Sequence, residues 1–176
     1  FEALYSAFSR MHVQKTWDGI LNTPISLDDV VLAEMLWAGF KALFSVIAIL
    51  GVMLALKISL SPKLILVPPI LLIAGVTFAS MALVFNAKAK GYDFFTYYFA
   101  VLLSPMMFLS GVFFPRTQLP AFAQAITDWL PLTAAVELVR PLFLNQCPAD
   151  AWRPLGILAV WAGVSFWWAR AFTRQR

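Results

Sequence analysis

The ionisable residue that stands out in this sequence is Lys41, a lysine inside an otherwise apolar stretch. An ammonium group at the middle of a bilayer costs about 2.5 to 3.5 kcal/mol on insertion scales, so its position requires an explanation. Because Lys41 comes little more than one helical turn after Leu36, its side chain can reach back to the membrane interface or to Glu34. The alternative is a place in a polar path across the membrane, where the ammonium group meets an anionic group of a passing molecule. The sequence leaves both interpretations open.

Two further charged residues, Glu137 and Arg140, are spaced three apart in a stretch that predicts a helix from Thr133. Side chains at this spacing lie on the same helical face and can form an ion pair. If the pair is exposed, it contributes only about 0 to 1 kcal/mol, and Pro141 directly after Arg140 shortens the helix beneath it. We expect the pair to hold helices in place rather than to contact a substrate.

Other residue types that perform chemistry are scarce. The eight glycines never form the GxxxxGK[ST] pattern of a phosphate-binding loop, so we expect no ATP or other cofactor on this chain. The single histidine, His12, and the single cysteine, Cys147, supply neither an HExxH zinc site nor a His/Cys metal cluster. No convincing set of nucleophile, base and orienting group is visible, and the sequence therefore does not indicate an enzyme.

The elements that must position these residues are membrane spans. Hydrophobic residues make up 61% of the chain and charged residues 12%, with a mean hydropathy of +0.80, far from the mixture typical of soluble domains. Backbone groups find no hydrogen-bond partners in lipid, which forces each span to be helical. The sequence predicts an all-α polytopic bundle with four apolar windows near the required length, namely 36–56, 64–85, 94–114 and 154–172.

Two connecting segments are long enough to carry specific functions, 1–35 and 115–153. Arginine and lysine are modestly more frequent on the side of the first, which places both ends of the sequence in the cytoplasm. Within 1–35, residues 16–21 are expected to form a short helix that Thr23 and Pro24 end. Ser26 is expected to cap a new helix whose first turn contains Asp28 and Asp29.

The segment 115–153 is broken into short pieces by Pro115, Pro120 and Pro131. Between the last two prolines, an amphipathic pattern predicts a helix at the membrane surface. Its apolar face would carry Phe122, Ile126, Trp129 and Leu130, and its polar face Gln124, Thr127 and Asp128. Phe113 and Phe114, just before these prolines, either face lipid or contact a substrate.

This organisation resembles that of ABC-2 type export permeases. The outer pattern of that family, SG-x-FFP followed by LP and PL-T-x-x-x-E-x-x-R, is matched by Ser110, Gly111, Phe113, Phe114, Pro115, Leu119, Pro120, Pro131, Leu132, Thr133, Glu137 and Arg140. Its cytoplasmic segment before the third span is matched by Arg10, Gln14, Thr16, Ile20, Leu21, Thr23, Pro24, Asp29 and Glu34. The resemblance covers nearly the whole of residues 1–176 and is strongest to the nodulation-type permeases that export lipo-oligosaccharides.

The resemblance implies functions for both segments. The outer helices would re-enter the membrane, and the inner segment would dock into a groove of a separate ATP-binding subunit, which holds the ATP and Mg²⁺. The residues implied in this coupling are Thr16, Trp17, Ile20, Leu21, Thr23, Pro24 and Asp29, with Trp17 and Ile20 as apolar contacts. The other interpretation of the inner segment is a solvated connector. By the same resemblance the chain is a fragment carrying spans three to six of six.

We therefore expect a homodimeric permease subunit of an ATP-driven exporter in the bacterial inner membrane, with an amphiphilic glycan as cargo. The family also includes exporters of drugs and other small molecules. An integral-membrane lipid-modifying enzyme is a further alternative, but it would need acids or histidines clustered at one bilayer face, and only scattered acids are visible. An ion-coupled carrier usually needs carboxylates inside the spans, and a passive scaffold also remains open. Nothing in the sequence indicates nucleic-acid binding.

Overall fold

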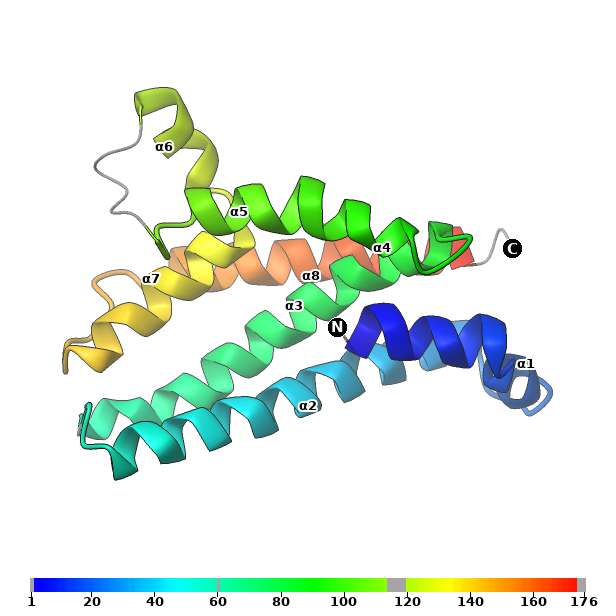
Figure 1. Ribbon diagram of the computed structural model, residues 1–176, viewed down its shortest axis with the longest axis horizontal. Coiled ribbons are helices and arrows are strands. Elements are labelled where there is room, and N and C mark those ends of the chain that lie inside the picture. The colour runs from blue at the N-terminus through cyan, green and yellow to red at the C-terminus, as the bar shows by residue number, and fades with distance from the viewer. Residues whose placement is uncertain (1, 60, 114–119, 174–176) are drawn as a thin grey trace.

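The computed structural model describes residues 2–59, 61–113 and 120–173. Throughout these ranges the chain is helical, turn or irregular, with no strand, and it forms the all-α bundle that the sequence predicts (Figure 1). Three helices are long and apolar enough to cross a membrane. They are α2 (Leu27–Ala55), α3 (Val67–Lys88) together with the preceding turn η3 (Pro62–Leu66), and α8 (Trp152–Thr173). The chain is therefore a multi-pass membrane protein.

Helix α3 is the central element, because it packs against α2 on one side and α8 on the other (Figure 1). The α2–α3 contact is close where two glycines face each other. A Cβ added to Gly39 would lie 2.6 Å from a Val76 methyl carbon, and one added to Gly75 would lie 3.2 Å from the Ala42 Cβ. Small residues let helix backbones approach in this way, and dispersion contacts then hold the pair together where no hydrophobic effect operates.

The window 94–114 forms a shorter helix than expected. It comprises α4 (Phe94–Tyr97), the π-helical η4 (Tyr98–Leu103) and α5 (Ser104–Leu109), and residues 110–113 are turn and bend. Pro105 has no N–H to donate to a carbonyl of the preceding turn, and the Phe99 carbonyl oxygen accepts from both the backbone N–H and the hydroxyl of Ser104, the latter over 2.9 Å. The irregular stretch thus lies directly before the proline.

Two short helices lie at the end of the bundle far from α1 (Thr16–Leu21): α6 (Ala121–Thr127) and α7 (Pro131–Phe143) (Figure 1). Helix α6 is shorter than the predicted amphipathic helix, because it ends at Thr127, and Trp129 and Leu130 lie beyond it. Within α6, Ile126 is exposed and Thr127 is buried, with its hydroxyl donating to the Gln124 carbonyl oxygen. Helix α7 begins at Pro131 rather than Thr133 and continues through Pro141.

The same end is joined to the turn between α2 and η3. The Ser59 hydroxyl donates to the Phe143 carbonyl oxygen over 3.0 Å, and Lys63 Nζ donates to the Asn145 carbonyl oxygen over 2.9 Å. These bonds hold the C-terminal end of α7 against the turn between α2 and α3.

An N-terminal helix, absent from the sequence prediction, lies across α2 and α3. It consists of η1 (Glu2–Ser6), residues 7–8 and η2 (Ser9–Val13). Its apolar face is buried, and Asn86 of α3 donates its amide to the carbonyl oxygens of Ala3 and Leu4 over 3.1 and 3.3 Å. Apolar residues spaced three and four apart from Ala3 to Phe8 are the signal that could have revealed this helix.

Candidate coupling site

The inner segment forms the short helix that the sequence predicts. Helix α1 spans Thr16–Leu21 and follows Lys15, whose φ of 50° turns the chain sharply after the N-terminal helix. At the other end, Thr23 donates its amide and its hydroxyl to the Ile20 carbonyl oxygen, and Pro24 follows. These local bonds explain why the helix stops after six residues.

The expected cap of α2 is also formed. The Ser26 hydroxyl accepts from the Asp29 amide over 3.2 Å, and the Asp29 carboxylate accepts from the Ser26 amide over 3.1 Å. This reciprocal capping box satisfies two backbone donors at the helix start and fixes where the loop after α1 meets α2.

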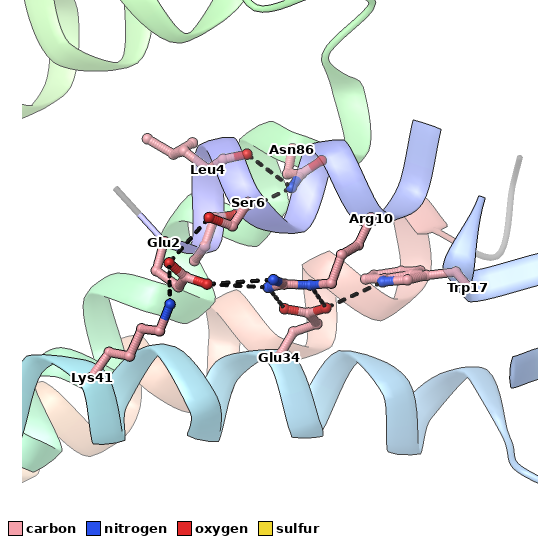
Figure 2. Close-up of polar contacts among 9 residues, drawn as sticks. Glu2, Leu4, Ser6, Arg10, Trp17, Glu34, Lys41 and Asn86 are labelled. Carbon is pink, nitrogen blue, oxygen red and sulfur yellow. Dashed lines mark hydrogen bonds and ion pairs between the residues drawn. The ribbon is translucent and has the colours of Figure 1, made fainter. Parts of the chain in front are cut away.

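Helix α1 is anchored through Trp17, which is only 4% exposed. The Trp17 indole N–H donates to Glu34 Oε1 of α2 over 3.3 Å (Figure 2). This side chain packs in the protein's own core, so the expectation that it forms an apolar contact with a partner is wrong for this conformation. The reason is that the indole finds both an apolar environment and an acceptor within the chain.

Arg10 connects the N-terminal helix to the same carboxylate. Its guanidinium donates from Nε to Glu34 Oε1 over 2.7 Å, and Nη1 lies 3.4 Å from Glu2 Oε1 (Figure 2). The hydrogen bond to Glu34, reinforced by both carboxylate charges, raises the pKa of Arg10. Arg10 therefore remains a cation at every pH the protein meets.

Lys41 completes the charged cluster of Glu2, Arg10, Glu34 and Lys41. Its ammonium lies 3.0 Å from Glu2 Oε2, so it reaches Glu2 of the N-terminal helix rather than Glu34 (Figure 2). Burial alone would raise the pKa of Glu2, but the hydrogen bonds from Lys41 and Ser6, with the charges of Lys41 and Arg10, bring it below its usual value. Two cations thus face two carboxylates, and the cluster is balanced in charge at neutral pH.

The outward side of residues 16–29 carries both apolar and polar side chains. Thr16, Leu21, Thr23, Pro24 and Asp29 are exposed. Ile25, exposed to 44%, and Leu21, exposed to 39%, replace Trp17 as the apolar side chains available at this surface. Beside them Ile20 is half-buried and lines a groove of about 730 Å³ that runs past Pro24 and Trp37 to the charged cluster. A short apolar element with polar flanks fits such a surface.

At the far end of the bundle, the structure pairs Arg140 with Gly111. The Arg140 guanidinium donates to the Gly111 carbonyl oxygen over 2.6 Å, and Gly111 adopts a φ of 80°. The ion pairs found among the described residues do not include the predicted one between Arg140 and Glu137. The acceptor that Arg140 finds is the carbonyl oxygen of Gly111, 29 residues away in the sequence. Residue spacing along one helix cannot predict such a distant partner.

The remaining residues of the outer motif are dispersed. Phe113 is exposed, with its ring 5.7 Å from that of Phe108, whereas Pro120 and Pro131 precede and begin α6 and α7. Phe114 and Pro115 lie outside the described residues. Throughout the described ranges, no group of three or more histidine, cysteine, aspartate or glutamate side chains could hold a metal ion.

The family model described as ABC-2 type transporter matches residues 1–144. The chain is 38% identical over 176 residues to nodulation protein J of Bradyrhizobium diazoefficiens, covering 100% of this chain and 67% of that protein. It is 36% identical to nodulation protein J of Rhizobium leguminosarum bv. trifolii and 35% identical to that of Rhizobium meliloti, with the same coverage. No solved structure matches the chain.

Proposed function

Because the chain belongs to the ABC-2 type transporter family, as a membrane subunit similar to nodulation protein J, we propose that it is the permease of an ATP-driven exporter of an amphiphilic glycan. A lipo-oligosaccharide or a lipid-linked polysaccharide is the cargo class we favour over drugs and other small molecules. The ATP and Mg²⁺ are bound by a separate ATP-binding cassette subunit, and the permease acts as a homodimer.

The arrangement of α1 carries this proposal. The outward side of α1 and of the loop after it presents Leu21, Thr23, Pro24 and Ile25, while the inward side of α1 is attached to α2 through the hydrogen bond from Trp17 to Glu34. A partner that pushes on the exposed side would therefore displace α2, one of the spanning helices. Coupling of a soluble motor to a membrane path requires such a rigid connection between a docking surface and a span.

The distribution of charge supports the orientation. Described cations at the α1 end of the bundle include Arg10, Lys15, Lys88, Lys90 and Arg170. Fewer lie at the opposite end, where Lys57, Lys63, Arg140 and Arg153 are found. By the positive-inside rule the α1 end faces the cytoplasm, where ATP is available, and the membrane is the bacterial inner membrane.

The choice of cargo class rests on the resemblance to nodulation-type permeases and on exposed side chains at the two ends of the bundle. Nodulation protein J is the name shared by the similar proteins from three different rhizobial sources described above. Exposed aromatic side chains at the α6 end, including Phe113, Trp129 and Trp152, provide surfaces for both sugar faces and acyl chains. Lys41, at 48% side-chain exposure, is placed to meet an anionic headgroup on the α1 side.

The experiment that tests the coupling surface is co-purification from native membranes in mild detergent. We expect an ATP-binding protein to elute with the wild-type permease in equal stoichiometry, and to be lost when Leu21 and Ile25 are both changed to Asp. The matched control is Ile58→Asp, which introduces the same charge at a 64% exposed residue at the other end of α2. Absence of any ATP-binding protein from the wild-type sample would overturn the exporter. Equal loss of the ATP-binding protein from the Ile58→Asp control would contradict the assignment of Leu21 and Ile25 to the docking surface.

A further inference from the structure

A groove between α3, α8 and the α4–η4 helix has no role in the coupling site. It has a volume of about 580 Å³ and is lined mostly by apolar side chains, among them Phe85, Leu102 and Trp168. Only two lining residues are polar, Ser165 and Lys88. The groove thus combines a long apolar wall with a single cation.

The cation lies at the end of the groove. Lys88 is the last residue of α3, is exposed, and has its Nζ 4.0 Å above the centre of the Phe172 ring of α8. No ion pair involving Lys88 is found within residues 2–59, 61–113 and 120–173. The ring holds the ammonium in position by a cation–π contact while leaving its charge unneutralised by those residues.

The membrane surroundings restrict what can occupy such a groove. Its walls include α3 and α8, both long and apolar enough to be spans, and Trp168 on its rim is 48% exposed. Water does not fill an apolar cavity, because it would lose hydrogen bonds there. A hydrocarbon chain from the surrounding lipid makes favourable dispersion contacts with the same walls.

We propose that this groove binds an anionic phospholipid of the bilayer, with one acyl chain along the apolar wall and the phosphate beside Lys88. The charge at one end and the apolar length behind it match the two parts of such a molecule. Lys88 ends α3, and that end of α3 lies on the same side of the bundle as α1 (Figure 1), so the bound lipid belongs to the leaflet on that side. The proposal does not depend on the cargo or on the ATPase. Only the assignment of this leaflet to the cytoplasmic side rests on the proposed function.

The irregular geometry of η4 makes this wall suited to a ligand. Leu102 lies in the π-helical stretch, and π-helical turns within membrane helices occur frequently at functional sites. A bound chain there would also support the packing of the α4–η4 helix on α3, which in the protein alone involves the Phe85 and Phe94 rings at 6.4 Å.

The test is native mass spectrometry of the full chain purified in mild detergent and exposed to dioleoyl phosphatidylglycerol or dioleoyl phosphatidylcholine. We expect preferential retention of phosphatidylglycerol by the wild type and about a fivefold weaker affinity in Lys88→Gln, since one cation near a membrane surface contributes on that scale. The control is Lys90→Gln, an exposed lysine two residues away that does not line the groove. It should retain the wild-type preference.

A second variant tests the groove independently of charge. Ser165→Leu places a larger side chain on the wall and should reduce retention of both lipids, with correct folding checked by size-exclusion elution. Equal losses in Lys88→Gln and Lys90→Gln would show general surface attraction and overturn the proposal. So would equal retention of the two lipids by the wild type, or unchanged retention by a correctly folded Ser165→Leu variant.

Discussion

Glu34 of α2 accepts hydrogen bonds from Trp17 of α1, over 3.3 Å, and from Arg10 of the N-terminal helix, over 2.7 Å. One carboxylate therefore joins both α1 and the N-terminal helix to α2. Its side chain is 11% exposed, so both bonds are largely shielded from water. A movement of α1 must be transmitted to α2 or must break these bonds.

The first prediction concerns this carboxylate. Changing Glu34 to Ala should release α1 and lower stability by about 1.5 to 3 kcal/mol, because hydrogen bonds to a charged group are lost and the Arg10 guanidinium keeps only Glu2. Hydrogen exchange of the amides in residues 16–21 should accelerate, and thermal unfolding in detergent should shift downward. Asp18→Ala, an exposed change on the same helix, is the control. Unchanged exchange in the Glu34 variant would contradict the anchoring role.

The second prediction concerns pH and Glu2. The pKa of Glu2 is lowered in the folded protein, so its contribution to stability is complete above about pH 4.5 and is lost as pH falls through the lower folded value. Lys41→Met removes one of the bonds responsible. The variant should therefore be less stable than the wild type near about pH 6, and the difference should shrink at an acidic pH low enough to protonate Glu2.

Thermal unfolding of the two proteins at both pH values checks this, with Lys90→Met as a control for the loss of a cation. A difference that persists unchanged at the lower pH would mean that Lys41 stabilises the protein through its Trp37 ring contact, 5.4 Å from the ring centre, rather than through Glu2.

How far the sequence predicts this structure depends on the separation of the interacting residues. The helix at 16–21 and the Ser26–Asp29 cap follow from neighbouring residues and are confirmed. The spans follow from apolar length, although the helix of the third window ends at Leu109, before a turn in which Gly111 adopts a φ of 80°.

Interactions between distant residues could not be predicted in the same way. Lys41 pairs with Glu2 and not with Glu34, because the unpredicted N-terminal helix brings a carboxylate closer. Trp17 faces inward because Glu34 lies one helix away, and nothing in the local pattern of α1 indicates which side α2 occupies.

The third prediction uses the close approach of α2 and α3. Gly39→Leu should destabilise the pair by about 1 to 3 kcal/mol, because even a Cβ at this residue lies 2.6 Å from Val76. Gly51→Leu, on the same helix, meets nothing within 4 Å and should change stability by less than about 0.5 kcal/mol. Thermal unfolding in detergent distinguishes the two. Similar shifts in both variants would show that the glycines matter through backbone flexibility and not through packing.

The last prediction concerns Arg140 and Gly111, which meet across a separation of 29 residues. Arg140→Ala removes a charged donor and should cost about 1.5 to 3 kcal/mol. Gly111→Ala should cost about 1 to 2 kcal/mol, because its φ of 80° strains any residue with a Cβ. Each change alone displaces the turn from α7, so the double variant should lose less than the sum of the two single losses.

The controls separate this contact from general effects on the outer helices. Arg153→Ala removes a more exposed guanidinium, 3.4 Å from Asp128, and should cost no more than about 1 kcal/mol. Gly163→Ala meets nothing within 4 Å and should be tolerated. Additive losses for Arg140 and Gly111 would mean that the two residues act separately. A loss smaller than the sum would show that Arg140 positions the turn directly after α5, and so determines how the helix of the third apolar window leads into the outer segment.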